Sequence, residues 1–248
     1  MTVLVGVRCT DGVVIGADSM ATSVAGVNPL AGFPTDKLSI IDGKVILAGT
    51  GAVGLGQRFQ AIVDSHWKKK TFQKSCVECT KLLSANTIND FQSTGLRPTQ
   101  HGYGFGALVA APMEKRAELV EFGVADFQPE RKDGKLNFVT MGSGQLLADP
   151  FMAFLSRVLW SGEQPDVKHA LFGVYWALNH TIKYAPSGVG GPIKLATLQK
   201  ANNDWSARIL SSDELEETSQ HIELVEEQIG KLPEQLLDDG NVEPVPTL

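Results

Sequence analysis

Four short apolar runs near the start of the chain predict two β-hairpins. The runs are Val3–Val7, Val13–Ala17, Leu38–Ile41 and Lys44–Ala48. Each pair is separated by an Asp-Gly step, which is typical of a tight turn between antiparallel strands. The stretch between the two hairpins, after Asp18, is rich in Gly, Pro and Asn, so it predicts a loop.

Apolar residues at helical spacing predict five helices in the rest of the chain. They cover Val53–Lys69, Ser75–Gln92, Gln145–Trp160, Val167–Lys183 and a last helix that follows the capping box Ser211-x-x-Glu214. The remaining apolar runs predict strands at Gly102–Ala110, Arg116–Val124, Leu136–Thr140, Pro192–Gln199 and Trp205–Leu210. Strand pairs that alternate with helix pairs indicate an α+β fold in which helices cover antiparallel sheets.

Composition narrows the class of protein. With 248 residues, 43% of them hydrophobic, the chain suits one domain with a sizeable core. The net charge of −6 argues against nucleic acid as a partner. The charge is uneven, because eleven acidic residues and one lysine lie from Asp213 onward, which leaves 21 basic and 17 acidic residues before it. We interpret the acidic end as a solvated surface.

The sequence lacks the patterns that are typical of exported, membrane-spanning and metal-binding proteins. It shows no signal peptide pattern and no apolar run long enough for a transmembrane helix, so we expect a cytoplasmic protein without membrane contact. Three cysteines argue against a disulfide framework. Cys76-x-x-Cys79 lies within a predicted helix and has no second ligand pair, so we expect packing there rather than a metal or redox site. We expect no metal or organic cofactor.

Thr2 is a candidate nucleophile. Removal of Met1, which is usual before a small residue, would leave Thr2 at the N-terminus. Its hydroxyl and a free α-amine of pKa about 7.7–8.0 would then share one residue, an arrangement that activates a weak nucleophile. The first hairpin brings Asp18 back beside the chain start. Met-Thr alone is a weak signal, since many chains begin that way.

The pattern TxxVGVxxxDGVVxxADSxAT over residues 2–22 resembles the N-terminus of proteasome β subunits. It is also similar to their bacterial relatives, Anbu and the bacterial proteasome homologue, and is most similar to the latter. The resemblance implies the four-layer αββα sandwich of N-terminal-nucleophile hydrolases. It covers nearly the whole chain, so we expect one domain over residues 1–230 and an acidic, flexible tail over 231–248.

The resemblance also implies a set of catalytic residues. Lys37, at the start of its strand, matches the lysine that lies beside the threonine, and Asp18 matches the aspartate that pairs with it. Ser143, in Gly-Ser-Gly, matches the serine that relays the proton of the amine. The backbone N–H of Gly49 matches the donor that stabilises the oxyanion. From the residues alone, Lys37 is an exposed lysine and Ser143 a helix cap.

Substrate contacts follow from the same resemblance. Thr22 and Gly49 would pair with substrate backbone as an added strand, and Leu47 would wall the pocket for the residue before the cut. From the residues alone, Gly49-Thr50-Gly51 is a turn from strand to helix.

The sequence departs from the proteasome pattern before Gly190-Gly191. Proteasome β subunits place a serine directly before this pair and an aspartate three residues earlier, whereas this chain has Val189 and Pro186, with Ser187 out of register. The resemblance therefore implies that the hydrogen bonds that orient the terminal amine differ from those of proteasome β subunits. The heat-shock-locus peptidase of bacteria, a relative, also lacks that motif.

These features predict a threonine-type endopeptidase that acts on peptides or unfolded proteins. The resemblance implies a homo-oligomer, with heptameric rings stacked face to face around an inner chamber, and leaves any unfoldase partner unknown. Two alternatives stay open: a ring with weak or lost catalysis, and a small-molecule amidohydrolase of the same superfamily.

Overall fold

The computed structural model describes residues 2–25, 28–185 and 188–238. The chain divides into two units, Met1–Leu210 and Ser211–Leu248, and each is described here on its own. The first unit contains the antiparallel sheets with covering helices that the α+β prediction required.

One five-stranded sheet contains both strands of the N-terminal hairpin. Its order is β10 (Phe138–Met141), β1 (Leu4–Arg8), β2 (Gly12–Ala17), β11 (Lys194–Ala201) and β12 (Asp204–Ile209). All neighbouring strands are antiparallel. Strands β1 and β2 occupy the middle of the sheet and are buried on both faces, which explains their nearly continuous apolar sequence.

The second five-stranded sheet has the order β5 (Leu38–Ile41), β6 (Val45–Gly51), β7 (Phe105–Met113), β8 (Arg116–Phe122) and β9 (Pro129–Arg131). Strand β9 was not predicted, because it is only three residues long and has no apolar alternation. The prediction of a loop after Asp18 was wrong. The segment instead contains two paired antiparallel strands, β3 (Met20–Ala25) and β4 (Asn28–Pro34).

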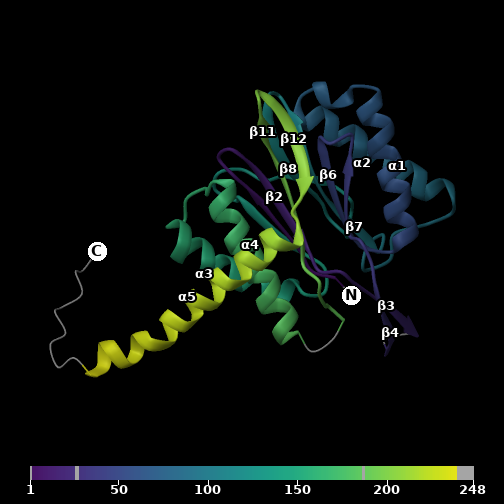
Figure 1. Ribbon diagram of the computed structural model, residues 1–248. Helices are drawn as coiled ribbons and strands as arrows, with labels where there is room; N and C mark the ends of the chain where they lie inside the picture. The colour runs from purple at the N-terminus through teal and green to yellow at the C-terminus, as the bar shows by residue number, and fades with distance from the viewer. Residues whose placement is uncertain (1, 26–27, 186–187, 239–248) are drawn as a thin grey trace. The chain divides into compact units, whose positions relative to one another are not determined.

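Helices cover the outer face of each sheet (Figure 1). Helices α1 (Val53–Lys68) and α2 (Cys76–Ser93) pack on the second sheet around a cluster of aromatic residues that includes Phe59, Phe105 and Phe122. Helices α3 (Gln145–Trp160) and α4 (Val167–Tyr184) pack on the first sheet. A separate apolar cluster that contains Leu4, Ile15, Ile46 and Leu108 fills the space between the two sheets. The first unit is therefore a four-layer αββα sandwich.

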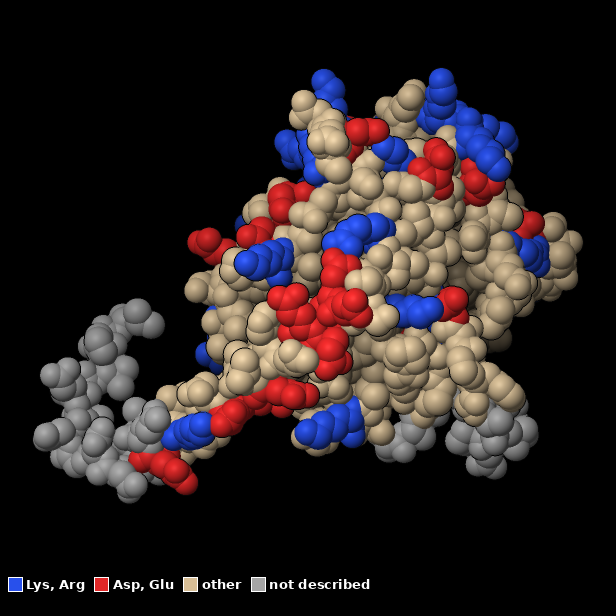
Figure 2. All heavy atoms as spheres, in the orientation of Figure 1, with Lys and Arg blue, Asp and Glu red and all other residues tan. Residues whose placement is uncertain are grey.

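The second unit consists of helix α5 (Ser212–Asp238). Its predicted capping box is present, because the Ser211 N–H donates to Glu214 Oε2 at 2.9 Å and the Glu214 N–H donates to Ser211 Oγ at 3.3 Å. The helix extends past residue 230, where we placed the start of the tail, and residues 239–248 lie outside the described residues. Acidic side chains lie along the length of α5 (Figure 2). No helix among the described residues is long and apolar enough to cross a bilayer.

Candidate active site

The N-terminal hairpin places Asp18 beside the start of the chain. Strands β1 and β2 pair from Arg8–Val13 back to Leu4–Ala17. Beyond that last pair, the Asp18 N–H donates to the Val3 carbonyl at 3.2 Å, and the Val3 N–H donates to Asp18 Oδ1 at 2.9 Å. The aspartate is therefore fixed one residue from Thr2, as the position of the Asp-Gly turn predicts.

The Asp18 carboxylate joins four segments of the chain. It is fully buried, with 0% of the residue exposed. Besides Val3, Lys37 Nζ donates to Oδ1 at 2.6 Å, and the N–H groups of Met20 and Gly190 donate to Oδ2 at 3.3 and 3.2 Å. The last two partners carry no side-chain signature, so sequence reasoning missed them.

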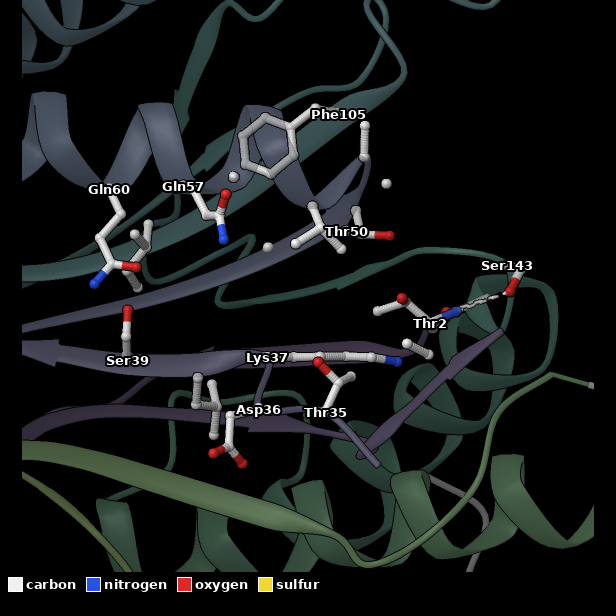
Figure 3. Close-up of a pocket in the computed structure, with 18 residues that line it drawn as sticks. Thr2, Thr35, Asp36, Lys37, Ser39, Thr50, Gln57, Gln60, Phe105 and Ser143 are labelled. Carbon is white, nitrogen blue, oxygen red and sulfur yellow. Dashed lines mark hydrogen bonds between the residues drawn. The ribbon is translucent and has the colours of Figure 1, made fainter. Parts of the chain in front are cut away.

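Lys37 directly precedes β5 and its side chain is 6% exposed. Burial lowers the pKa of the Lys37 amine, and the hydrogen bond and charge of Asp18 oppose that shift. Figure 3 shows the Lys37 side chain extended toward Thr2. The geometry therefore places a cation whose charge is balanced by Asp18 next to the candidate nucleophile.

The Gly-Ser-Gly step lies against the N-terminal residue. Strand β10 pairs with β1 and ends opposite Leu4, so the next residues lie beside Thr2. The Thr2 N–H donates to Ser143 Oγ at 3.1 Å, and the Gly144 N–H donates to the Thr2 carbonyl at 3.1 Å. At Gly142, φ is +94° and an added Cβ would lie 2.3 Å from the Thr2 oxygen, so only glycine permits this approach.

A cleft of about 600 Å³ opens from Thr2 between β5, β6 and α1 (Figure 3). Leu47 and Gly49, the residues that the resemblance assigns to substrate contacts, line it. Most of the other lining residues were not predicted, and those with larger side chains include Thr35, Ser39, Gln57, Gln60 and Phe105. They lie on four different segments of the chain, so no local sequence pattern identifies them as residues of one site. Thr22 lies in β3, where it pairs with Gly32; its side chain is outside the described part of the chain.

The backbone N–H of Gly49 is engaged in the sheet. It donates to the Lys37 carbonyl at 3.3 Å, in the ladder that joins β5 and β6. Alternate N–H groups of a strand face the same side. The next N–H that faces β5 belongs to Gly51. Continuing the register places Gly51 opposite Thr35, which precedes the first residue of β5, so the strand offers no ladder partner there. Gly51 also lines the cleft.

The loop before β11 contacts Asp18 through its backbone. The Gly190 N–H bonds to Asp18, and its carbonyl accepts the Ser19 N–H at 3.0 Å. Val189, in the position of the proteasome serine, is buried. Pro186 and Ser187 lie outside the described residues, as does Met1.

Cys76 and Cys79 are free thiols on the buried face of α2. Burial raises the pKa of Cys76 to about 11 and that of Cys79 to about 12. In the described part of the chain, no cluster of three or more His, Cys, Asp or Glu could hold a metal ion. Both cysteines pack in the apolar cluster that α1 and α2 form with the second sheet.

Comparison with known proteins identifies the family and agrees with the fold. The family model described as proteasome subunit matches residues 2–154. The solved structure of a Gly-1 mutant of Anbu from Hyphomicrobium sp. strain MC1 is similar, with a TM-score of 0.69 and 16% sequence identity. That match covers 94% of this chain and 100% of the Anbu chain. No curated protein sequence matches the chain significantly.

Proposed function

Because the chain belongs to the proteasome subunit family, a family of N-terminal-nucleophile hydrolases, we propose that it is a threonine-type endopeptidase with Thr2 as the nucleophile. One observation carries the proposal. The backbone nitrogen of Thr2, which becomes the α-amine once Met1 is removed, is held 3.1 Å from Ser143 Oγ. Lys37, which pairs with Asp18, extends toward Thr2 from a different side than Ser143 (Figure 3).

The reaction begins when the Thr2 hydroxyl oxygen attacks the carbonyl carbon of a peptide bond. The Thr2 amine takes the hydroxyl proton, and Ser143 orients that amine. As the C–N bond breaks, the proton passes to the departing amine, and the acyl group stays on Thr2 as an ester. Water then hydrolyses the ester and regenerates the free hydroxyl.

Two further groups stabilise the negative charges that develop during the reaction. Lys37, held by Asp18, lowers the free energy of the alkoxide that forms on Thr2. For the oxyanion, the Gly49 N–H named from the resemblance already has a partner in the Lys37 carbonyl. We therefore assign oxyanion stabilisation to the Gly51 N–H, and such a donor contributes about 2.7–4 kcal/mol to catalysis.

Assembly belongs to the same proposal. Membership of the proteasome family supports a homo-oligomer, and we propose stacked heptameric rings that enclose the active sites. An enclosed chamber would restrict cleavage to peptides and unfolded chains, so that a cytoplasmic peptidase spares folded proteins of its own cell. Thr22 and the end of β6 at Gly51, beyond the start of β5, would hold the substrate as an added strand.

The intact mass of purified protein, with and without a peptide epoxyketone, tests the proposal. This reagent crosslinks a hydroxyl and an amine on one residue. We expect a chain that lacks Met1 and gains one inhibitor mass, with no gain in Thr2→Ala. Native mass of the same sample separates a ring from a small amidohydrolase.

A processed ring that never gains the inhibitor would refute the peptidase. It would favour the inert ring, for which the buried Val189 in place of a serine is the supporting observation.

A further inference from the structure

The cleft beside Thr2 contains uncharged hydrogen-bonding groups. Gln57 and Gln60 project into it from one face of α1, and the Ser39 hydroxyl points from β5 toward α1 (Figure 3). The spacing of three residues places both glutamines on the same side of the helix. Neither glutamine side chain hydrogen-bonds to any residue that the structure describes, and the same is true of the Ser39 hydroxyl. These three groups are therefore available to a ligand.

The charged groups that line the cleft are already neutralised. Among the described lining residues, only Lys37 and Asp36 carry charge. Lys37 pairs with Asp18 at 2.6 Å, and Asp36 pairs with Lys194. A charged substrate side chain would thus lose water without gaining an opposite charge, which is unfavourable. An uncharged side chain avoids that penalty.

Gly49 gives the cleft its depth. A Cβ added at Gly49 would lie 3.1 Å from the Phe105 ring, so any side chain there would narrow the space between β6 and α1. Phe105 and Leu47 supply apolar surface along the cleft. A side chain that enters from Thr2 therefore needs an apolar stem and a polar end.

We propose that this cleft selects peptides whose residue before the cut has a long, uncharged, hydrogen-bonding side chain, with glutamine the best fit. Gln57, Gln60 and Ser39 are the residues that determine this specificity. Their amide and hydroxyl groups pair with the substrate carboxamide, which offers two donors and one acceptor oxygen. The inference rests on the proposed function for its cleavage step, but the binding preference can be measured separately.

Fluorogenic peptides that differ only in that residue test the preference. Glutamine is compared with methionine and glutamate, which have similar length, and with the longer, positively charged arginine. We expect kcat/KM for glutamine to exceed each of the others by about tenfold, since one or two net hydrogen bonds contribute about 0.5–1.5 kcal/mol each. A flat series, or preference for methionine, would overturn the inference.

Variants connect the preference to the named residues. Gln57→Leu/Gln60→Leu should bring glutamine and methionine to within about twofold. Gln57→Glu should raise the rate for arginine by about tenfold through a new charged pair. Gln73→Leu, an exposed glutamine outside the cleft, is the matched control and should keep the wild-type preference. A glutamine preference that survives the double substitution would contradict the assignment.

A binding measurement separates this inference from the proposed function. Product peptides ending in each of the four residues are titrated calorimetrically into Thr2→Ala, which lacks the nucleophile. Tighter binding of the glutamine peptide supports the specificity even if wild-type Thr2 never reacts with an epoxyketone. Equal affinities overturn the specificity even if Thr2 reacts.

Discussion

Asp18 should matter more to stability than the lysine it pairs with. Asp18→Ala removes the acceptor of four hydrogen bonds and leaves the Lys37 charge without its buried partner. Lys37→Met removes one of those four bonds, and the carboxylate keeps the backbone N–H groups of Val3, Met20 and Gly190. A carboxylate that accepts two or three backbone N–H bonds is well stabilised.

The magnitudes follow from these contacts. Removing one partner of a buried pair destabilises a protein by about 3–5 kcal/mol, and each buried N–H without an acceptor adds about 1–3 kcal/mol before relaxation. Because the truncated site can relax and admit water to the freed N–H groups and to Lys37, the sum is an upper bound; we expect Asp18→Ala to lower the free energy of unfolding by about 4 kcal/mol and Lys37→Met by about 2 kcal/mol. For a chain of this length these values correspond to about 8–16 °C and about 4–8 °C in Tm.

Urea unfolding, followed by fluorescence of the four tryptophans at one fixed protein concentration, measures the difference. Fixed concentration is needed because an oligomer couples assembly to stability. As a control, Asp18→Asn/Lys37→Met should be more stable than Asp18→Asn alone, because it removes the charge that has lost its partner. A Lys37→Met variant that is as unstable as Asp18→Ala would refute the reasoning, since it would mean that the backbone donors contribute nothing.

Three more outcomes follow from the site and the core. Ser143→Ala should slow epoxyketone labelling of Thr2 by about ten- to a hundredfold, because the Thr2 nitrogen loses its Oγ partner; an unchanged rate would exclude the positioning role. Gly142→Ala should lower the free energy of unfolding, measured with urea, by more than about 1 kcal/mol, because Gly142 has a positive φ and an added Cβ would clash with the Thr2 oxygen. Native protein at pH 8 should leave Cys76 and Cys79 unalkylated by iodoacetamide, since their pKa values of about 11 and 12 keep them protonated. Their reactivity should rise about tenfold per pH unit, and rapid alkylation at pH 8, detected by intact mass, would contradict their burial.

The sequence was most informative where local chemistry fixes geometry. An Asp-Gly turn sets the register of β1 and β2, and that register alone brings Asp18 to Val3. The helices likewise follow from their apolar spacing: the ends of α1 to α4 differ from the prediction by at most one residue, whereas α5 extends to Asp238, beyond the predicted end of the domain at residue 230. In these places, contacts between neighbours in the sequence determine the structure.

The hairpin of β3 and β4 could not be predicted in this way. Its residues include Pro29 and Pro34, which normally argue against a strand. A two-stranded sheet leaves half of its N–H groups outside any ladder, so proline is tolerated there. The Gly190 contact to Asp18 joins residues 172 positions apart, and a backbone donor leaves no mark on the sequence.

The oxyanion donor illustrates the same limit, because the choice between two glycines depends on where a neighbouring strand begins. Strand β5 starts at Leu38, so the Lys37 carbonyl still accepts the Gly49 N–H, whereas the Gly51 N–H is level with Thr35, beyond that strand. Gly51 also has a φ of +101°, and an added Cβ would lie 2.1 Å from the Gly104 carbonyl oxygen, so substitution would test folding rather than catalysis. A crystal structure of the Thr2 adduct with a peptide boronate avoids that problem, because its tetrahedral oxygen stands in for the oxyanion. We expect that oxygen within about 3.1 Å of the Gly51 nitrogen, with the Gly49–Lys37 bond intact; an oxygen on Gly49, with that bond broken, would overturn the assignment.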